Sequence, residues 1–152
     1  MIRLLFDEML SRTATWSRIF GVDSAHAAGK SDSEIIKLAK EEGRTLITRD
    51  AELAGRCKTH GIPFFLLEDD VLSHQLGQLK SAFGDIYTFP EGTRCPACNG
   101  KLAVAGKEAV RGKVLEGVLN KNEKFWVCTD CGKTYWEGSH WKNILRVFKS
   151  IK

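Results

Sequence analysis

Two pairs of cysteines constrain the fold of this chain more than any other feature of its sequence. Cys95 and Cys98 form one C-x-x-C pair, Cys128 and Cys131 form a second, and 29 residues lie between the pairs. Each pair lets two thiolates hold one ion from a single turn, and two such turns make a closed tetrahedral sulfur site. We expect zinc in a structural role, because four sulfurs leave no position for water or substrate. A rubredoxin-like iron site and two disulfides are the alternatives.

The cysteine pairs predict a zinc ribbon in residues 91–152. This segment has few large apolar side chains between the pairs, so we expect it to need the metal in order to fold. Gly100 and Gly132 follow the pairs and should give the chain the conformational freedom to fold back toward the sulfurs. The stretch 113–127 suits β-strands with a turn near 120–123.

Aromatic and basic residues are interleaved after the second cysteine pair. They include Lys133, Tyr135, Trp136, His140, Trp141 and Lys142. Such a mixture can stack on bases and contact phosphates, which makes Lys133, His140 and Lys142 candidates for nucleic-acid binding. Alternatively, the tryptophans cover the cysteine turns or dock the ribbon on the rest of the chain, and Ile144, Leu145 and Phe148 form the packing face of a terminal helix.

The charge is divided unevenly along the chain. Residues 1–90 hold 11 Lys or Arg and 13 Asp or Glu, a net charge of −2, whereas residues 91–152 hold 12 and 6, a net charge of +6. Four thiolates on one divalent ion contribute −2, which leaves the C-terminal part at about +4. The C-terminal part is therefore the one better suited to a polyanion.

Residues 1–90 alternate short apolar runs with helical patterns. The expected strands are 2–6, 22–26, 45–48 and 63–67, and the expected helices begin near Met9, Ser31, Ala51 and Val71. This alternation implies right-handed β-α-β crossovers and a parallel sheet with helices on both faces. The predicted fold class is α/β.

Acidic residues recur where the expected strands end. Asp7, Glu8, Asp50, Asp69 and Asp70 follow strands, and Asp32 and Glu34 lie in the first turn of a helix that should begin at the same edge. Sites in parallel sheets form beyond the carboxyl ends of the strands. Several anions at one edge repel one another unless a cation intervenes, and Mg²⁺ or Mn²⁺ favours carboxylate oxygens.

Each of these acids also has a purely structural interpretation. Asp50 can cap the helix that follows it, since an aspartate oxygen accepts the free N–H groups of a first helical turn. Glu34 can complete a capping box with Ser31, and Asp69 or Asp70 can cap the last helix of this part. The acids alone therefore leave caps and a shared metal site as alternatives.

The chain is expected to reside in the cytoplasm, without membrane contact. No run approaches the ~20 apolar residues of a membrane span, and the first residues lack the longer apolar region of a signal peptide. In that compartment paired cysteines bind metal rather than oxidise. The unpaired Cys57 is expected to be a buried structural thiol.

Four segments of the chain together resemble a known family. They read FDEMLSRTATWSRIFGVDS, SDSEIIKLAKEEGRTLITRDAELA, CPACNG and CTDCGKTYWEGSHW. In this order they resemble the predicted RNase domain at the C-terminus of the Mut-seven exonuclease family, which also occurs as small free-standing prokaryotic proteins. The resemblance implies a PIN-like nuclease domain over residues 1–90 and a zinc ribbon with a C-terminal helix over residues 91–152. At about 90 residues the first part is short for a PIN fold, so the rim of its site is either incomplete or completed by the ribbon.

The resemblance also implies an activity, the hydrolysis of phosphodiester bonds in RNA with Mg²⁺ or Mn²⁺. The acids it implies are Asp7, Asp32 and Asp50 as metal ligands, Glu8 and Glu34 as neighbouring acids that assist, and Asp69 or Asp70 as a fourth ligand. Arg12 and Arg49 would steady the phosphate or balance the charge of the acids.

Two other functions are compatible with the residues. A noncatalytic RNA-binding or adaptor module would use the acids as caps and bind through its ribbon. A phosphoacceptor domain like bacterial receivers would fit the order of elements and Asp50 after the third strand. The chain lacks the lysine expected after a fifth strand of a receiver, and a zinc ribbon is foreign to that class.

Overall fold

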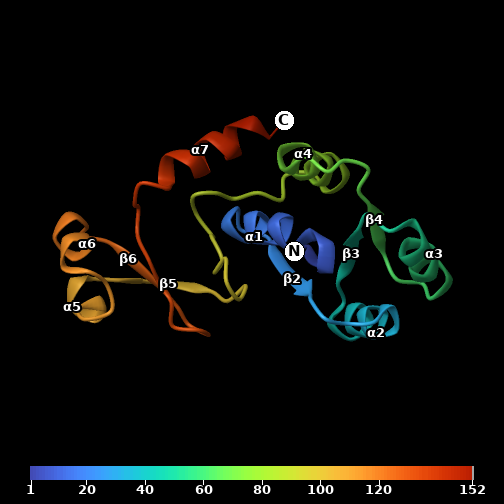
Figure 1. Ribbon diagram of the computed structural model, residues 1–152, viewed down its shortest axis with the longest axis horizontal. Coiled ribbons are helices and arrows are strands. Elements are labelled where there is room, and N and C mark those ends of the chain that lie inside the picture. The colour runs from blue at the N-terminus through green and yellow to red at the C-terminus, as the bar shows by residue number, and fades with distance from the viewer. Residues whose placement is uncertain (152) are drawn as a thin grey trace.

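The computed structural model describes residues 1–151, which form two β-sheets (Figure 1). The first sheet is parallel, with strand order β2-β1-β3-β4, and consists of β1 (Arg3–Asp7), β2 (Asp23–Ala27), β3 (Thr45–Thr48) and β4 (Phe64–Leu66). The helical elements between and after these strands are the 3-10 turn η1 (Glu8–Leu10), α1 (Ser11–Ile19), α2 (Asp32–Glu42), α3 (Ala51–Thr59) and α4 (Leu72–Phe83). The expected parallel sheet flanked by helices is confirmed.

The side chains of β1 alternate between the two faces of this sheet. Leu5 packs with α2 and α3, where Ile36 is one of its neighbours in the core, whereas Leu4 and Phe6 pack with α1 and α4 on the other face. All three β1 side chains are fully buried. A strand covered on both faces must be apolar on both, which explains the continuous apolar run from Leu4 to Phe6.

The strand order creates a switch point at the carboxyl ends of β1 and β3. The chain leaves β1 to form β2 on one side, and then crosses back over β1 to form β3 on the other side. Connections that diverge in this way leave a crevice beyond the strand ends, where ligands bind in α/β folds. Asp7 ends β1 and Asp50 precedes α3, so both acids lie at the switch point.

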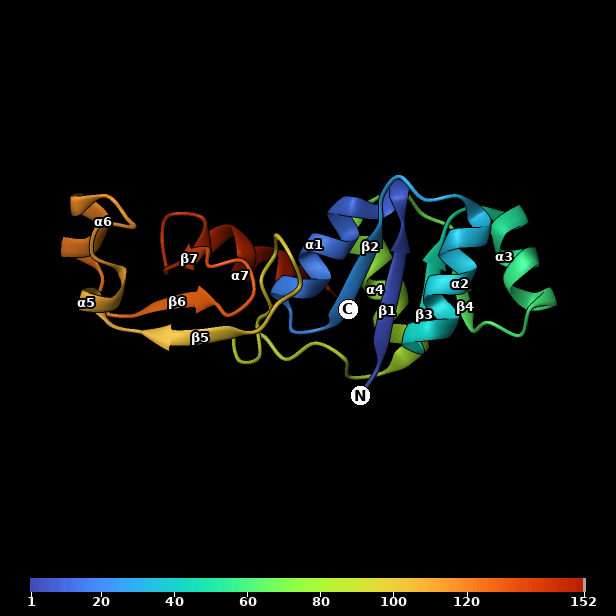
Figure 2. The same ribbon diagram turned by 90° about the horizontal axis from the view of Figure 1, so that it is seen from below.

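The second sheet is antiparallel and carries the cysteines. Its strands are β5 (Leu102–Ala105), β6 (Phe125–Cys128) and β7 (Thr134–Tyr135), paired in that order. Two short helices, α5 (Lys107–Val110) and α6 (Glu116–Lys121), lie at the end of this sheet that is remote from the first one (Figure 2). We call residues 94–136 the ribbon.

The strand expected before a turn near residues 120–123 is wrong, because α6 covers residues 116–121, and the chain then bends at Glu123 before β6 begins. Leu119 of α6 is 1% exposed and packs together with Val110 of α5 against Phe125 of β6. A small sheet that is apolar on one face must cover that face, and the two short helices provide the cover. The apolar residues before the expected turn therefore follow a helical spacing and not the alternation of a strand.

The last helix, α7 (Trp141–Ser150), leaves the ribbon and packs on the first part of the chain (Figures 1 and 2). The ring centroid of Phe148 lies 5.2 Å from that of Phe20 and 5.4 Å from that of Phe89. The residues expected on the packing face all join this cluster, namely Ile144, Leu145 and Phe148. The terminal helix thus shares a core with α1 and α4.

The first cysteine turn contacts the amino end of β2. Asn99 Oδ1 accepts the backbone N–H of Ser24 at 2.9 Å, and Asn99 Nδ2 donates to Asp23 Oδ1 at 2.7 Å. The buried guanidinium of Arg18 donates to the carbonyl oxygens of Pro96 at 2.9 Å and of Ser24 at 2.7 Å. The ribbon is therefore fixed near the amino edge of the first sheet, opposite to the edge at which the acids lie.

We expect Phe148→Ala to destabilise the protein by about 2–3 kcal/mol, somewhat less than truncation of a fully buried phenylalanine. The substitution removes the ring that packs against Phe20 and Phe89. Urea unfolding followed by tryptophan fluorescence measures the change. Lys149→Ala, at the exposed neighbouring position, is the matched control and should change stability by less than about 0.5 kcal/mol. Equal effects of the two substitutions would contradict the packing role of α7.

Candidate active site and metal centre

One threonine at the switch point links the carboxylate of Asp7 to the backbone of Asp50. The hydroxyl of Thr48, the last residue of β3, donates a hydrogen bond to Asp7 Oδ2. Thr48 Oγ1 in turn accepts the backbone N–H of Asp50 at 3.0 Å. Because Thr48 is fully buried, this linkage is shielded from water and fixes the two acids next to each other.

Asp7 is a buried carboxylate, and one of its oxygens accepts no hydrogen bond within residues 1–151. Its side chain is among the buried polar groups of the protein, and Oδ1 has no hydrogen-bond partner. Burial raises the pKa of this carboxyl above its usual range, and hydrogen bonding from Thr48 and from the backbone N–H of Met9 opposes the rise; the charge of Asp50 adds a smaller increase. A buried acceptor without a partner is costly to the fold, so Asp7 is placed at the expense of stability.

The expectation that Asp50 caps α3 is confirmed. Its Oδ1 accepts the backbone N–H groups of Glu52 at 2.9 Å and Leu53 at 3.2 Å. Its other carboxylate oxygen is not used in the cap, and a carboxylate can accept at both oxygens. The two interpretations of Asp50 are therefore compatible, since capping engages one oxygen and leaves the second for a ligand.

Two other predicted acids are engaged in local structure. Glu34 Oε1 accepts the backbone N–H of Ser31 at 3.0 Å and completes the predicted capping box at the start of α2. Asp69 accepts the backbone N–H of Val71 at 2.8 Å and pairs with His74 at 2.7 Å. The contact of Glu34 is that of a cap, whereas the contact of Asp69 forms a turn before α4. The expected cap of α4 by Asp69 or Asp70 is wrong, because the N-cap of α4 is Val71 and no side chain caps this helix. These contacts account for Glu34 and Asp69 without a metal. The exposed Asp70 makes no side-chain hydrogen bond with any residue in 1–151.

Asp32 and Glu8 lie toward the same edge as Asp7 but are directed to other partners. Asp32 Oδ2 pairs with Arg56 of α3 at 3.3 Å. Glu8 Oε1 accepts the backbone N–H of Gly29 at 3.2 Å, in the loop between β2 and α2. The structure thus brings Asp7 and Asp50 together, whereas Glu8 is hydrogen-bonded to the loop before α2 and Asp32 forms an ion pair with Arg56.

His26 is a member of this edge that the sequence did not reveal. It lies in β2 opposite Phe6, and its Nε2 is 3.0 Å from the carbonyl oxygen of Glu8. Because Glu8 directly follows Asp7, this contact places the imidazole at the same edge of the sheet as the buried carboxylate. The signal in the sequence was a lone histidine at the end of an expected strand, which becomes informative only once β2 is known to pair with β1.

The acidic pair fits a magnesium or manganese ion that keeps part of its water shell. Within residues 1–151 no three carboxylates or histidines approach one another closely enough to form a complete protein cage. Mg²⁺ is usually held by only one or two carboxylates, with waters and substrate phosphates completing its octahedron. The unpartnered Asp7 Oδ1 and the unused oxygen of Asp50 meet this requirement, so the donors present suit such an ion.

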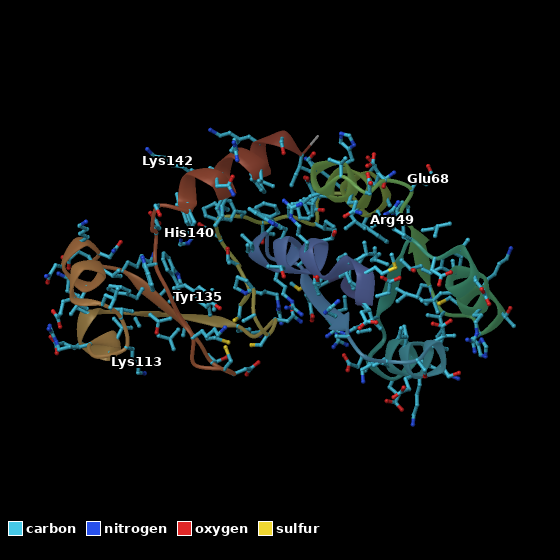
Figure 3. All side chains as sticks on the ribbon, in the orientation of Figure 1. Arg49, Glu68, Lys113, Tyr135, His140 and Lys142 are labelled. Carbon is cyan, nitrogen blue, oxygen red and sulfur yellow. The ribbon has the colours of Figure 1, made fainter. Side chains whose placement is uncertain are left out.

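Arg12 and Arg49 are distinguished from every other arginine by having no partner. Within residues 1–151 the remaining arginines all donate to a carboxylate, an amide oxygen or a backbone carbonyl. Arg49 lies between Thr48 and Asp50, and Arg12 lies in the first turn of α1, directly after η1. Both side chains are exposed, and Figure 3 shows Arg49 near Glu68 at the ends of β3 and β4. Arg12 and Arg49, which have no partner among residues 1–151, therefore lie close to Asp7 and Asp50 in the chain.

The four paired cysteines form a site that can hold a metal ion such as zinc. Their sulfurs all lie within 4.8 Å of one another, with Cys95 3.7 Å from Cys131 and Cys98 3.4 Å from Cys128. A tetrahedral zinc with bonds of about 2.3 Å sets its sulfurs about 3.8 Å apart, close to these separations. The cysteines are free thiols without disulfides, and Cys57 is buried as expected.

Hydrogen bonds to sulfur prepare this site for thiolates. Burial opposes the ionisation of Cys128, but the backbone N–H groups of Cys131 and Asp130 outweigh it and lower the pKa of Cys128 to about 7. The hydroxyl of Tyr135 lies 3.0 Å from Cys95 Sγ. The ribbon thus carries donors for the negative charge of the sulfurs.

The two glycines after the cysteine pairs serve different purposes. Gly132 has a φ of +78° and fulfils the expected need for a left-handed residue. Gly100 is required for space, because a Cβ at this position would lie 2.7 Å from Cys128 Sγ. The first turn can approach the second closely only if residue 100 has no side chain.

The basic residues predicted for the C-terminal part lie away from the acidic pair. Lys133 is exposed just after the second cysteine turn, and His140 and Lys142 are exposed at the start of α7. Figure 3 shows His140 and Lys142 on the ribbon side of the molecule, with Arg49 on the opposite side. Any substrate that touches both groups must extend along the protein.

The chain combines a parallel α/β sheet, acids at its switch point and a four-cysteine ribbon. A comparison with protein families agrees with this combination. Residues 2–148 match the family model described as Mut7-C RNAse domain, and the chain belongs to that family. Membership points to a nuclease-like role. No curated protein and no solved structure was found to match. In the part of the chain that the structure describes, no helix has both the length and the apolar character required to cross a bilayer.

We expect Asp7→Asn to raise the stability of the metal-free protein at neutral pH. Asparagine can still accept the Thr48 hydrogen bond but carries no buried charge. Because the pKa of Asp7 is raised in the folded state, wild type bears the penalty fully above that pKa and loses it as the pH falls toward the unfolded value of about 3.9. Thermal melts of both proteins across this range should show the difference shrinking at lower pH. Added Mn²⁺ should stabilise wild type more than the variant, and equal stabilisation would contradict a metal site at Asp7.

We expect Gly100→Ala to lower zinc content below the roughly one zinc per chain of a four-cysteine site. The new Cβ would press on Cys128 Sγ and on the side chain of Asp130. Elemental analysis after dialysis measures the loss. Gly117→Ala, whose Cβ would meet no atom within 4 Å, is the matched control and should keep its zinc. Full occupancy in Gly100→Ala would argue against the close approach of the two turns.

Proposed function

We propose that this chain is a metal-dependent ribonuclease that hydrolyses RNA phosphodiester bonds at the switch point between β1 and β3. The observation that carries the proposal is the unpartnered oxygen of buried Asp7 beside Asp50. A fold that needed only caps would not bury a carboxylate whose oxygen has no donor. The family supports a nuclease-like role, and its name supports RNA as the substrate.

Asp7 and Asp50 would hold one Mg²⁺ or Mn²⁺ ion between them. When bound, such an ion activates water and stabilises negative charge on a leaving oxygen. Thr48 keeps both carboxylates in place, and the cap on α3 prevents Asp50 from rotating away. We assign Asp32 and Glu8 supporting roles, since each is held by another partner, and we assign Glu34, Asp69 and Asp70 none beyond the helix starts.

Arg12 and Arg49 would bind the phosphates of the substrate. Their guanidinium groups are exposed and free of internal partners, and an arginine fork matches two phosphate oxygens. The cluster of acids would otherwise repel a polyanion, so cations at its rim are needed for approach. His26 would offer an imidazole at this edge, since its Nε2 lies 3.0 Å from the carbonyl oxygen of Glu8, the residue that follows Asp7.

The ribbon would bind zinc in a structural role and hold RNA electrostatically. The C-terminal segment that contains it, residues 91–152, has a net charge of +6, whereas residues 1–90 have a net charge of −2. The four-sulfur site itself is closed to substrate. We propose that residues 1–90 act as the nuclease part and residues 91–152 as the zinc-binding part. The division is one of function, because α7 of the second part packs in a shared core with the first. The free thiols fit a reducing compartment, for which we propose the cytoplasm.

Cleavage assays on Asp50→Asn test this proposal. Asparagine should retain the cap on α3, while the loss of one carboxylate should lower the cleavage rate at least about 100-fold. Labelled single-stranded RNA, structured RNA and DNA of the same sequence are incubated with Mg²⁺, Mn²⁺ or no added divalent ion. Zinc content is measured in parallel, so that removal of the structural metal is not mistaken for removal of a catalytic one.

The matched control is Asp85→Asn, an exposed aspartate without a side-chain hydrogen bond in residues 1–151. It should cleave at the wild-type rate. Cleavage that persists undiminished in Asp50→Asn, or without any divalent ion, would refute the assignment. Retention of RNA without turnover in wild type would instead identify the noncatalytic binding module.

A further inference from the structure

One face of the ribbon sheet is left uncovered by the ribbon itself. Phe125 and Val127 of β6 point to the side that is packed with α5 and α6. Trp126 alternates with them, and its partners in register are Val104 of β5 and Tyr135 of β7. These three side chains therefore share the opposite face, where Val104 remains 66% exposed.

This open face forms one wall of a cavity of about 760 Å³. The other walls come from Trp136 and His140 in the segment that leads to α7, from Trp141 of α7, and from Phe89 in the connection between the two sheets. Figure 3 shows Tyr135 and His140 on the two sides of this region. The volume lies within the range of pockets that take small organic groups.

The lining of the cavity is unusually aromatic. Three of the four tryptophans of the chain line it, and the fourth, Trp16, belongs to the core under α7. Trp136 and Trp141 also contribute to hydrophobic clusters, whereas Trp126 belongs to none of the core clusters in residues 1–151. Core packing therefore does not account for Trp126.

Positive charge lies over one of these rings. Lys124 Nζ is placed above the Trp126 ring, 5.2 Å from its centroid. The lysine side chain is long and flexible, so its ammonium can move from the ring to a phosphate when a base stacks there. Glu91 and Glu137 also line the cavity and repel phosphate, which confines the backbone of a nucleic acid to the Lys124 side.

A basic path leads from this cavity toward the acidic pair. Lys142, Arg146 and Lys149 are exposed on α7 at intervals of four and three residues, which places them on one helix face. The helix begins at Trp141 in the cavity wall, and at its far end Ile151 joins the cluster that holds the first residue of α4. Figure 1 shows α7 running from the ribbon to α4, the helix that follows β4, so the basic residues of α7 extend from the cavity toward the first part of the chain.

We propose that the cavity binds a base of single-stranded RNA, with the phosphates that follow it lying along the basic face of α7. The proposal rests on the proposed ribonuclease function and names the part of the substrate that the ribbon holds. The cavity adjoins Ile19, at the end of α1 near the amino edge, and β1 is about 17 Å long. The bound base is therefore separated from the acidic pair by several nucleotides, and only an extended single strand reaches both.

Binding of a fluorescein-labelled single-stranded RNA to the full, zinc-loaded chain tests this. Anisotropy is read without added Mg²⁺ or Mn²⁺, so that binding is measured apart from cleavage. We expect Trp126→Ala to weaken binding about 10-fold or more, and Trp126→Phe to retain most of the affinity, because phenylalanine also stacks. Lys124→Ala should weaken binding several-fold, whereas Lys113→Ala, which removes an exposed lysine remote from the cavity, should not.

A second arm leaves the protein unchanged and alters the RNA. An oligonucleotide made of abasic sugar phosphates keeps the charge but cannot stack, and it should bind wild type no better than normal RNA binds Trp126→Ala. Unchanged affinity for abasic RNA, or for RNA in Trp126→Ala with normal zinc content, would overturn the base pocket. Binding that depends on Trp126, without any cleavage, would support the base pocket and refute the ribonuclease. Cleavage together with binding that does not depend on Trp126 would support the ribonuclease and refute the base pocket.

Discussion

The coverage of β1 on both faces and both edges is the constraint on which the rest of the structure depends. Leu5 holds one helical layer and Leu4 and Phe6 hold the other, while β2 and β3 pair along the two edges. A strand enclosed in this way has no freedom to shift its register. Its last residue, Asp7, is thereby fixed in the interior, and the Thr48 hydrogen bond can reach it only because β3 is paired in the matching register.

The ribbon is joined to this frame at two separate places. Asn99 and Arg18 connect the first cysteine turn to the start of β2, and α7 packs across α1 and α4. Asp23, which receives the Asn99 amide, also pairs with Arg44 at 2.8 Å, and although burial opposes ionisation these donors lower the pKa of Asp23 to about 2. The same network thus ties the beginning of β2 to the segment before β3 and to the ribbon, so the sulfur site and the parallel sheet constrain each other.

Much of this organisation could be predicted from the sequence, because it depends on local patterns. The alternation of elements, the capping box at Ser31, the cap by Asp50 and the four-cysteine site each depend on residues close together in the chain. The sequence also identified Arg12 and Arg49 as the cations next to the acids. Only the fold shows that these two have no partner within residues 1–151, whereas Arg56 is bound to Asp32. His26 and the α6 helix were missed because their roles depend on β2 pairing with β1 and on the need to cover Phe125.

Under the proposed function, the positions of the acidic pair and of the basic C-terminal part explain how a short sheet would gain a substrate site. A basic ribbon placed directly beside the acids would neutralise them and compete with a metal for their oxygens. Here the sulfur site docks at the amino edge, and only α7 extends back toward the carboxyl edge, with its apolar face on Phe20 and its basic face outward. Under the proposed function, attraction of a polyanion and binding of a divalent cation would take place at opposite ends of the molecule.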